Sequence, residues 1–538
     1  MARTLGGWVA AASAAVLLGC GASGGPTPSS VAAADTGAGT SPSDGGTTGS
    51  GGGTASGSTA AQPPSLTPPV SRDGWTYYGS GQGLPGTVFD VSADEGGNVY
   101  VAGYDAVYAK RRGDAGFLRF DATNSTLTQN CYPAPPETDP TFNDAINGTL
   151  HPAPPGPPIL CPVISVAGAA PGLAAIGFKG LGTDGDPDAG WAQDSGGMDV
   201  VTFDGASLAR RRHVFIASPP GTICGPYPGH PNEERSATCG DPWEYFWTVG
   251  RRKLRQVDRI VVNHDQGSQM YGDMWMGGTH ATFAALLADA GARGYPDRTA
   301  GQTDPRWADA KDVWEHDHPA WYDAASNLFL TNVTFALALQ PGSGIPWGSN
   351  GLRTAYVTGG YGAALQGDNW WIGPNDGAHP LWIDLWTDPG TPGAPMDPLG
   401  GADDHVESLS FCDDGTLWVA SSTHGLARLD PGAGGGLSYV ALPDPATHGN
   451  NAYAVACDPT DGSVWVGLGW GGVMRYRNGA FTALDPNPPG MPAVVRQPVR
   501  SIQIDRWASP RIVYFAFMPS TDASGKAVPG GIAAYAGP

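Results

Sequence analysis

The sequence predicts an all-β repeat protein. Three observations support this class: a composition rich in glycine and proline, a strand-turn-strand pattern that recurs along the chain, and complementary strands at the two ends of the repeat region. The chain has 538 residues, of which 81 are Gly and 50 are Pro, and only 15% are charged. Without a strict Gly-X-Y period or a helical pattern, this composition argues against collagen and against a helical bundle.

The charge balance argues against nucleic acid as a partner. Acidic residues outnumber basic ones 50 to 29, which gives a net charge of -21, and the basic residues are scattered along the chain. A nucleic-acid-binding surface needs a basic patch or stripe. After the first 20 residues, no apolar run approaches the roughly 18 to 20 residues that span a bilayer as a helix. We therefore expect the mature chain not to cross a membrane.

The first twenty residues have the anatomy of an export signal. Arg3 supplies a positive charge, Val9–Leu18 forms a short apolar stretch, and Leu17-Leu18-Gly19-Cys20 ends it. These last four residues match the bacterial lipobox, which predicts a lipoprotein signal peptide over 1–19 and lipidation at Cys20. The alternative is a secreted protein that is cleaved at a nearby small residue. Because Gly21 and not Asp follows the cysteine, we expect anchoring in the bacterial outer membrane, facing the periplasm or the cell surface.

The composition of residues 20–72 predicts a disordered tether. They are almost wholly Gly, Ser, Thr, Ala and Pro, with no aromatic residue and no basic residue before Arg72. Such a composition cannot build a core. As a flexible coil, the segment would span on the order of 40 Å.

A repeated strand-turn-strand unit begins after the tether. Val88–Asp94 is an apolar segment that ends in Asp, and Gly97-Asn98-Val99-Tyr100-Val101 follows it. The same spacing recurs at Ala452–Asp458 and Val499–Asp505, and with small changes at Val406–Asp413 and Val257–Asn263. Each copy predicts two short strands that are joined by a turn suited to Asp and Gly.

The second half of the unit also repeats. Val473–Thr482 reads as a strand, an Asn478-Gly479 turn and a further strand. Four antiparallel strands in about 40 residues are typical of a β-propeller blade. Seven such units start near Val88, Val163, Val257, His318, Val406, Ala452 and Val499, and the second and fourth are degenerate.

The two ends of the repeat region indicate how the ring closes. Gly530–Tyr535 is a third strand without a fourth, and Gly74–Tyr78 is a fourth strand without a blade. We therefore predict a seven-bladed β-propeller of four-stranded antiparallel blades over 73–538, closed by the N-terminal strand, with loop insertions near 121–161, 218–250, 289–316 and 340–400. A linear solenoid is the rival architecture, and it leaves the N-terminal strand unexplained.

The best-formed unit, Ser410–Val419 continuing to Gly425-Leu426, resembles the two-component-regulator propeller repeats of periplasmic sensor proteins. The resemblance implies an extracytoplasmic ligand-sensing propeller. In that family a membrane helix and a kinase commonly follow, and the present sequence shows neither. The resemblance therefore supports the fold and a binding role, but not signalling.

Six cysteines remain after Cys20, an even number that suits disulfides in an exported chain. Cys224 and Cys239 flank a Gly/Pro-rich loop, and Cys131 and Cys161 bracket a Pro-rich insertion, so both are candidate pairs. Cys412 and Cys457 occupy matching positions in adjacent units. We expect these two to be buried thiols, because equivalent points on adjacent blades should lie too far apart for a disulfide.

Histidines cluster at one predicted rim, which is formed by the loops after second strands and before first strands. The candidate binding residues there are His280, His316, His318, His405, His424, His448 and Trp470. In one interpretation His405, His318 and His448 are structural staples that bind turn carboxylates. In the other, the imidazoles bind a ligand such as a glycan, a peptide or a protein partner, or a divalent metal. No cofactor motif accompanies them.

An enzymatic alternative uses the same rim. Some seven-bladed propellers are lyases that act on polysaccharides or lactones with a His or Tyr base and a metal. His280, His424 and Tyr361 have suitable side chains, but no nucleophile elbow, zinc-binding helix or phosphate loop accompanies them. The binding function is therefore the main hypothesis, and the catalytic residues stay unassigned.

Overall fold

The structure is a computed structural model, and its described residues fall in one compact unit, Pro64–Pro538. Strands form nearly all of the regular structure described, apart from one 3-10 turn at Ser80–Gln82. No helix among these residues is long and apolar enough to cross a membrane. The residues described are 66–131, 157–180, 195–214, 223–227, 230–236, 256–266, 271–272, 274–278, 281–285, 313–317, 322–323, 328–329, 336–342, 346–349, 354–357, 382–384, 406–422, 425–429, 438–443, 451–469, 472–484, 498–521 and 525–537.

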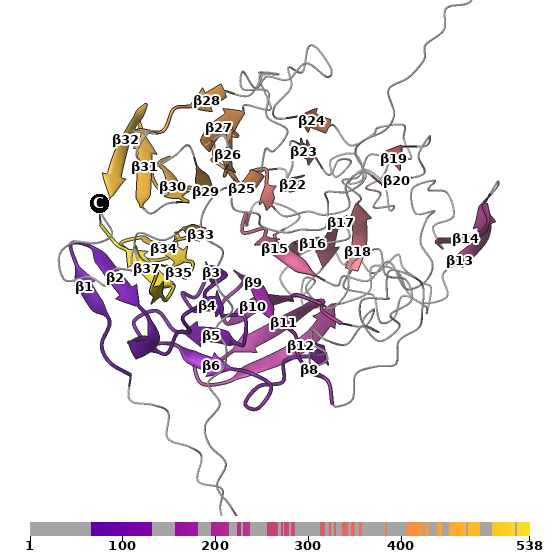
Figure 1. The fold of residues 1–538 in the computed structure, drawn as a ribbon, viewed down its shortest axis with the longest axis horizontal. Coiled ribbons are helices and arrows are strands. Elements are labelled where there is room, and N and C mark those ends of the chain that lie inside the picture. The colour runs from indigo at the N-terminus through magenta and orange to yellow at the C-terminus, as the bar shows by residue number, and fades with distance from the viewer. Residues whose placement is uncertain are drawn as a thin grey trace, which may run out of the picture. The chain divides into compact units, whose positions relative to one another are not determined.

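The described strands build six four-stranded antiparallel sheets and one five-stranded sheet (Figure 1). Sheets 1 to 3 come first along the chain. Sheet 1 contains β3 (Asp90–Ala93), β4 (Val99–Ala102), β5 (Val107–Lys110) and β6 (Leu118–Phe120). Sheet 2 contains β9 (Val163–Gly168), β10 (Leu173–Phe178), β11 (Met198–Phe203) and β12 (Leu208–Val214). Sheet 3 contains β15 (Val257–Val262), β16 (Met274–Gly278), β17 (Ala281–Ala285) and β18 (Val313–Asp317).

Sheets 4 to 6 follow in the same pattern. Sheet 4 contains β21 (Ala336–Leu339), β22 (Pro346–Ser349), β23 (Thr354–Val357) and β24 (Trp382–Asp384). Sheet 5 contains β25 (Val406–Phe411), β26 (Leu417–Ser421), β27 (Gly425–Leu429) and β28 (Ser438–Val440). Sheet 6 contains β29 (Ala452–Cys457), β30 (Val464–Leu468), β31 (Val473–Arg477) and β32 (Ala480–Leu484).

Sheet 7 joins the two ends of the folded region. Its order is β1 (Val70–Arg72), β2 (Trp75–Tyr78), β37 (Gly531–Tyr535), β34 (Ile512–Phe517) and β33 (Val499–Asp505). Trp75 lies opposite Tyr535, and Tyr78 lies opposite Ile532. The expected pairing of the N-terminal strand with the last strand is therefore confirmed.

Four two-stranded pairs of short strands lie outside these sheets in the described part of the chain. They are β7 (Gln129–Cys131) with β8 (Ile159–Leu160), β13 (Ile223–Tyr227) with β14 (His230–Ser236), β19 (Tyr322–Asp323) with β20 (Leu328–Phe329), and β35 (Ser520–Thr521) with β36 (Ala527–Val528).

Two expectations about the fourth unit were wrong. Its first strand is β21 and does not start near His318, because 313–317 instead forms β18, the last strand of sheet 3. The segment 340–400, expected as a loop insertion, supplies the other three strands of sheet 4. The first strand of this unit, Ala336–Leu339, is followed by Gln340, whereas the clearer repeated segments end in Asp or Asn. A long connection also separates β23 from β24, so the repeat pattern is not visible in the sequence.

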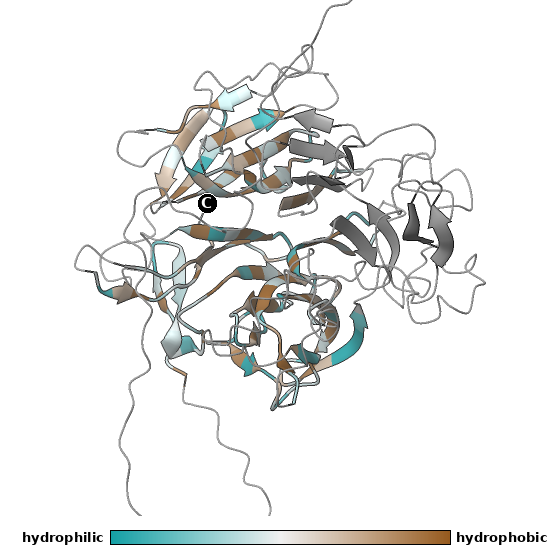
Figure 2. Ribbon diagram, turned by 45° about the vertical axis from the view of Figure 1, so that its right-hand side comes forward, coloured by the Kyte–Doolittle hydropathy of each residue, from teal (hydrophilic) through white to brown (hydrophobic). Residues whose placement is uncertain are grey.

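The apolar core lies between successive sheets. Each buried cluster draws side chains from two neighbours: Tyr100 of sheet 1 packs with Phe203 of sheet 2, and Trp465 of sheet 6 packs with Phe515 of sheet 7. Central strands such as β4, β10 and β30 are buried along their whole length. Figure 2 shows the resulting hydrophobic stretches along the strands. Burial of both sheet faces explains why these strands read as continuous apolar runs.

The first strands of the sheets lie next to one another in chain order. β3 contacts β9, β9 contacts β15, β15 contacts β21, and so on through β25 and β29 to β33, which contacts β3. The approach is close: a Cβ on Gly168 of β9 would lie 2.4 Å from the Ala93 carbonyl carbon of β3. Glycine is required there because no side chain fits between the two backbones.

The aspartate that ends the repeated segment is a buried tie to the next sheet. Asp94 accepts a hydrogen bond from the Gly172 N–H of sheet 2 at 2.7 Å, and Asp505 pairs with Arg112 of sheet 1 at 2.9 Å. Asp458 binds Arg511 of sheet 7. All three aspartates are 0% exposed. The recurring Asp in the sequence therefore fixes the contact between sheets as well as its own turn.

Candidate functional site

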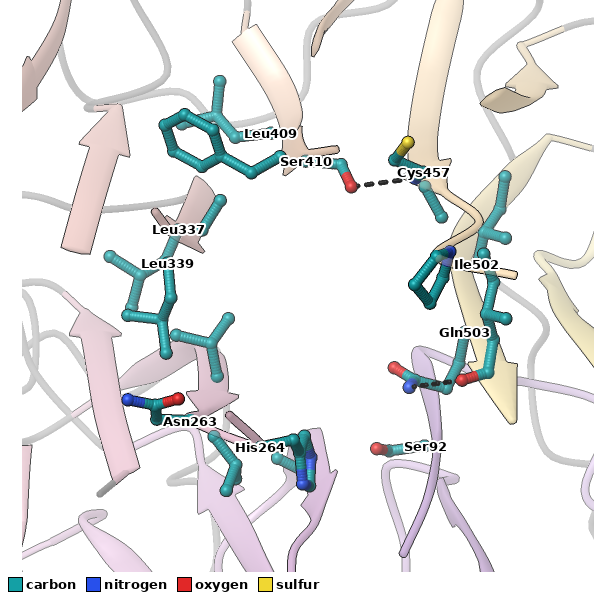
Figure 3. Close-up of a pocket in the computed structure, with 18 of the residues that line it drawn as sticks. Ser92, Asn263, His264, Leu337, Leu339, Leu409, Ser410, Cys457, Ile502 and Gln503 are labelled. Carbon is teal, nitrogen blue, oxygen red and sulfur yellow. Dashed lines mark hydrogen bonds between the residues drawn. The ribbon is translucent and has the colours of Figure 1, made fainter. Parts of the chain in front are cut away.

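A cavity of about 870 Å³ lies among the first strands, and every one of the seven sheets contributes to its wall (Figure 3). Representative wall residues are Ser92, Gly168, Val262, Leu339, Ser410, Cys457 and Gln503, one from each sheet. The wall combines aliphatic side chains with serine, asparagine and glutamine. Such a mixed lining suits a ligand that offers both apolar surface and hydrogen-bonding groups.

Short polar side chains hold the wall strands in register. The Gly168 N–H donates to Ser92 Oγ at 2.9 Å, and the Cys457 N–H donates to Ser410 Oγ at 2.9 Å. Ser501 Oγ donates to Asp90 Oδ1 at 2.6 Å. Each bond joins the first strands of two successive sheets, so much of the polar surface of the wall serves the fold.

Asp90 neutralises one of the two arginines that line the cavity. Its carboxylate accepts the Val166 N–H at 3.1 Å and the Ser501 hydroxyl, and it lies 3.6 Å from the Arg259 guanidinium. The Arg259 side chain is 19% exposed. Because this pair is enclosed within the wall, Arg259 contributes little net charge to a ligand.

The second arginine lies where the first strands end. Arg506 and Trp507 follow β33 of sheet 7, and His264 follows β15 of sheet 3, and all three line the cavity. We call this group, His264, Arg506 and Trp507, the turn mouth. Arg506 Nη2 donates to the His264 carbonyl oxygen at 3.0 Å, and the Arg506 guanidinium carbon lies 5.1 Å from the centre of the Trp507 ring. The His264 and Trp507 ring centres are 4.8 Å apart in an edge-to-face arrangement.

A carboxylate from a third sheet fixes the His264 ring. Nδ1 of His264 lies 3.0 Å from Glu95 Oε1, and the Tyr271 hydroxyl donates to Glu95 Oε2 at 2.5 Å. Burial lowers the pKa of His264, and the Glu95 carboxylate offsets part of this shift. The imidazole is therefore neutral near pH 7, with the proton on Nδ1 and a lone pair on Nε2.

The opposite end of the first strands carries a different set of charges. Register shifts in five first strands each leave one residue unpaired with the second strand: Ile164, Asp258, Glu407, Tyr453 and Arg500. A β-bulge re-aims its side chain, and here it does so at the same position of several sheets. We call Asp258, Glu407 and Arg500 the start rim.

The start rim contains an ion pair between sheets that are not adjacent in the chain. Arg500 Nη1 of sheet 7 lies 3.6 Å from Glu407 Oε2 of sheet 5. Burial raises the pKa of Asp258 to about 6, although a hydrogen bond from Gln256 and the positive charges of Arg500 and Lys179 act in the opposite direction. Asp258 Oδ2 is buried without a hydrogen-bond partner among the described residues. The start rim is therefore charged, and one of its carboxylate oxygens lacks a hydrogen-bond partner among the described residues.

The histidine rim that the sequence predicts lies mostly outside the described residues. The rim residues outside the described part are His280, His318, His405, His424, His448 and Trp470. The predicted lipidation site Cys20 also lies outside it. His316 is placed in β18, where it pairs in register with Phe283, and so it does not lie in a loop before a first strand. Tyr361 also lies outside the described residues.

One disulfide expectation is confirmed and one is wrong. Cys131 and Cys161 form a disulfide, as expected. Cys412 and Cys457, expected as free thiols, also form a disulfide, with a Cα–Cα distance of 5.1 Å. Cys412 directly follows β25 and Cys457 ends β29, and these first strands lie side by side. Cys224 lies in β13, and Cys239 is outside the described residues, so that pair stays a prediction.

The turn mouth was missed, although the sequence holds a signal for it. Glu95, His264 and Arg506 each follow directly after the residue that ends the repeated segment, namely Asp94, Asn263 and Asp505. Aligning the units on that residue places all three at one end of the first strands. The histidines instead predicted a site at the other end of the first strands, because histidine is the more usual marker of a site.

Within the described part of the chain, no group of three or more His, Cys, Asp or Glu residues could hold a metal ion. No protein-family model and no curated protein sequence matches the chain.

Proposed function

We propose that residues 73–538 form a seven-bladed β-propeller whose central cavity binds a small ligand. The sheets are the blades, and the N-terminal strand completes the last one. Two relationships support this architecture: the series of contacts between first strands, which returns from β33 to β3, and the pairing of β2 with β37. The resemblance to two-component-regulator propeller repeats points to the same fold and to a sensing or binding role.

The binding function rests on a single observation, namely that all seven first strands line one cavity. Its volume of about 870 Å³ lies within the ~300–1,000 Å³ typical of small-ligand pockets. A glycan segment or a short peptide has this size, whereas a folded protein partner would contact only the surface. The ligand would approach at the turn mouth, where the side chains of Arg506 and Trp507 lie.

A cavity-filling variant tests this function. Gln503 projects from β33 into the cavity (Figure 3), so Gln503→Trp should place a bulky ring where a ligand would contact β33 and thereby block binding. The matched control is Thr482→Trp, which adds the same side chain at an exposed position of β32. A panel of oligosaccharides and short peptides is screened by isothermal titration calorimetry. We expect binding to be lost only in Gln503→Trp; equal binding by both variants would contradict a central site.

We further propose that the protein is an extracytoplasmic lipoprotein, anchored at Cys20 through the tether 20–72. The lipobox sequence Leu17-Leu18-Gly19-Cys20 supports this location. Membrane partitioning of the wild-type protein and of Cys20→Ala tests it. We expect the wild type in the membrane fraction and the variant in the soluble fraction; a variant that still sediments with membranes would overturn the anchor.

A further inference from the structure

The turn mouth offers hydrogen-bonding groups that have no partner among the described residues, and these groups suit one class of ligand. We propose that the turn mouth recognises the carboxylate of a hydroxylated acid, such as a uronate residue of a glycan, through Arg506 and Trp507. This inference rests on the proposed binding function and names the chemistry of its ligand.

Arg506 is a cation without an acidic partner among the described residues. Of the two arginines in the cavity wall, Arg259 has the carboxylate of Asp90 at 3.6 Å, whereas no described carboxylate lies within ion-pairing distance of Arg506. This contrast is unexpected in a chain with a net charge of -21. A guanidinium without an acidic partner at the mouth of a cavity is available to an external anion, and its planar fork matches a carboxylate.

The structure also fixes the direction of the Arg506 donors. One nitrogen, Nη2, is held by the His264 carbonyl oxygen at 3.0 Å, and the guanidinium lies against the Trp507 ring. These contacts occupy part of the guanidinium and leave Nε and Nη1 without partners among the described residues. Because the Arg506 side chain is already ordered, it loses less conformational entropy when a ligand binds.

The neighbouring rings add a donor and an acceptor. The Trp507 indole N–H has no hydrogen-bond partner among the described residues, so it can donate to a carboxylate oxygen. His264 Nδ1 is taken by Glu95, which leaves the Nε2 lone pair for a ligand hydroxyl. A carboxylate with hydroxyl groups nearby, as in a uronate ring, satisfies both requirements. The C-terminus of a peptide offers the carboxylate without the hydroxyl.

Acidic side chains elsewhere in the wall restrict where the anion can lie. Asp265 and Asp413 also line the cavity, from sheets 3 and 5. Their charges oppose an anion in the cavity as a whole. The ligand carboxylate must therefore contact Arg506 directly, and the neutral part of the ligand occupies the remainder of the cavity.

The experiment compares an acid with its neutral ester. Trigalacturonic acid and its fully methyl-esterified form are titrated into the full chain by calorimetry at low and physiological salt. We expect the acid to bind at least tenfold more tightly than the ester, as a charge-assisted hydrogen-bond pair requires. Arg506→Gln should abolish this preference, and Arg506→Lys should restore only part of it. Trp507→Phe keeps an aromatic ring and removes the indole N–H. It should weaken binding of the acid and leave binding of the ester unchanged.

Arg428→Gln is the matched control, because Arg428 is an exposed arginine on β27 outside the cavity. It should bind the acid as the wild type does. The proposal is overturned if the acid does not bind, if acid and ester bind equally, or if Arg506→Gln binds the acid as tightly as Arg428→Gln. A short peptide that binds more tightly with a free C-terminus than any uronate also overturns it.

These outcomes are separable from failure of the proposed function. If a neutral glycan or an amidated peptide binds and Gln503→Trp removes that binding, the central site stands while the carboxylate inference fails. If no ligand of either kind responds to Gln503→Trp, both fail. Thermal melting of each variant verifies that the fold is retained.

Discussion

Arg112 and Asp505 form an ion pair that joins the beginning and the end of the folded region. Arg112 Nη2 lies 2.9 Å from Asp505 Oδ2, across 393 positions of sequence. Asp505 is fully buried, and the Arg112 side chain is 34% exposed. Burial raises the pKa of Asp505, and the Arg112 charge opposes that shift. The arginine therefore compensates a carboxylate that water cannot reach.

Removing this arginine should destabilise the fold. Arg112→Ala leaves the Asp505 carboxylate buried without its cation, so we expect a loss of about 2–3 kcal/mol, toward the low side of buried pairs because Arg112 is partly exposed. The adjacent Arg111→Ala removes an arginine whose pair with Asp114 is exposed, and it should change stability by less than about 1 kcal/mol. Urea denaturation measures both. Equal effects would show that the pair does not connect sheet 1 to sheet 7.

The disulfide between sheets 5 and 6 should contribute measurable stability. It closes a sequence separation of 45 residues, and the double variant Cys412→Ala/Cys457→Ala should lose up to about 4 kcal/mol in the chain-entropy model. Differential scanning calorimetry without reductant measures the change. Alkylation of the unreduced wild type by a thiol reagent under denaturing conditions provides the check, because labelled Cys412 or Cys457 would mean that the bond is absent.

The strand β2 should be required for stability, whereas the exposed side chains of β1 should not. Trp75 is 3% exposed, and its ring lies 4.7 Å from Tyr535 and 5.5 Å from Phe515. Trp75→Ala should therefore cost about 3–5 kcal/mol. The triple variant Val70→Ala/Ser71→Ala/Arg72→Ala, which truncates the exposed side chains of β1, should have a much smaller effect. Comparable melting temperatures for the two variants would exclude β2 as a structural part of sheet 7.

Asp258 should make stability depend on pH. Its pKa in the folded protein is raised to about 6, above the value of about 4 in an unfolded chain. The folded state therefore binds more protons between these values, and the stability from this group is present at low pH and lost as pH rises from about 4 to 6. Asp258→Asn should remove this dependence and raise stability at pH 7 by up to about 3 kcal/mol.

Chemical denaturation of the wild type and Asp258→Asn at pH 4, 5, 6 and 7 measures the difference between them. Glu407→Gln is the control from the same start rim. Because Glu407 is paired with Arg500, removing its charge should not stabilise the folded protein. A constant difference between the wild type and Asp258→Asn over this pH range would contradict the assignment.

The sequence by itself determined the local units of this protein. Apolar segments ending in Asp, Asn-Gly turns such as Asn478-Gly479, and the strand Trp75–Tyr78 depend on neighbouring residues, and the structure contains β29, β33, the β31–β32 hairpin and the β2–β37 pairing where they were expected. The fourth unit was not located because its first strand is followed by Gln340 and not by Asp or Asn, and because β24 is far from β23 in sequence. The Cys131–Cys161 disulfide could be predicted from the sequence because both cysteines flank one insertion.

Only the tertiary structure decided which residues meet at the cavity. His264 and Trp507 are separated by more than two hundred positions and come from sheets 3 and 7, yet their rings are 4.8 Å apart. Cys412 and Cys457 show the same effect, because the repeat marks them as equivalent but does not give the distance between them. That distance depends on how closely successive first strands approach, as at Gly168 and Ala93, and this is a property of packing between sheets. A repeat in the sequence specifies each sheet, whereas the separation of the sheets places the functional groups together.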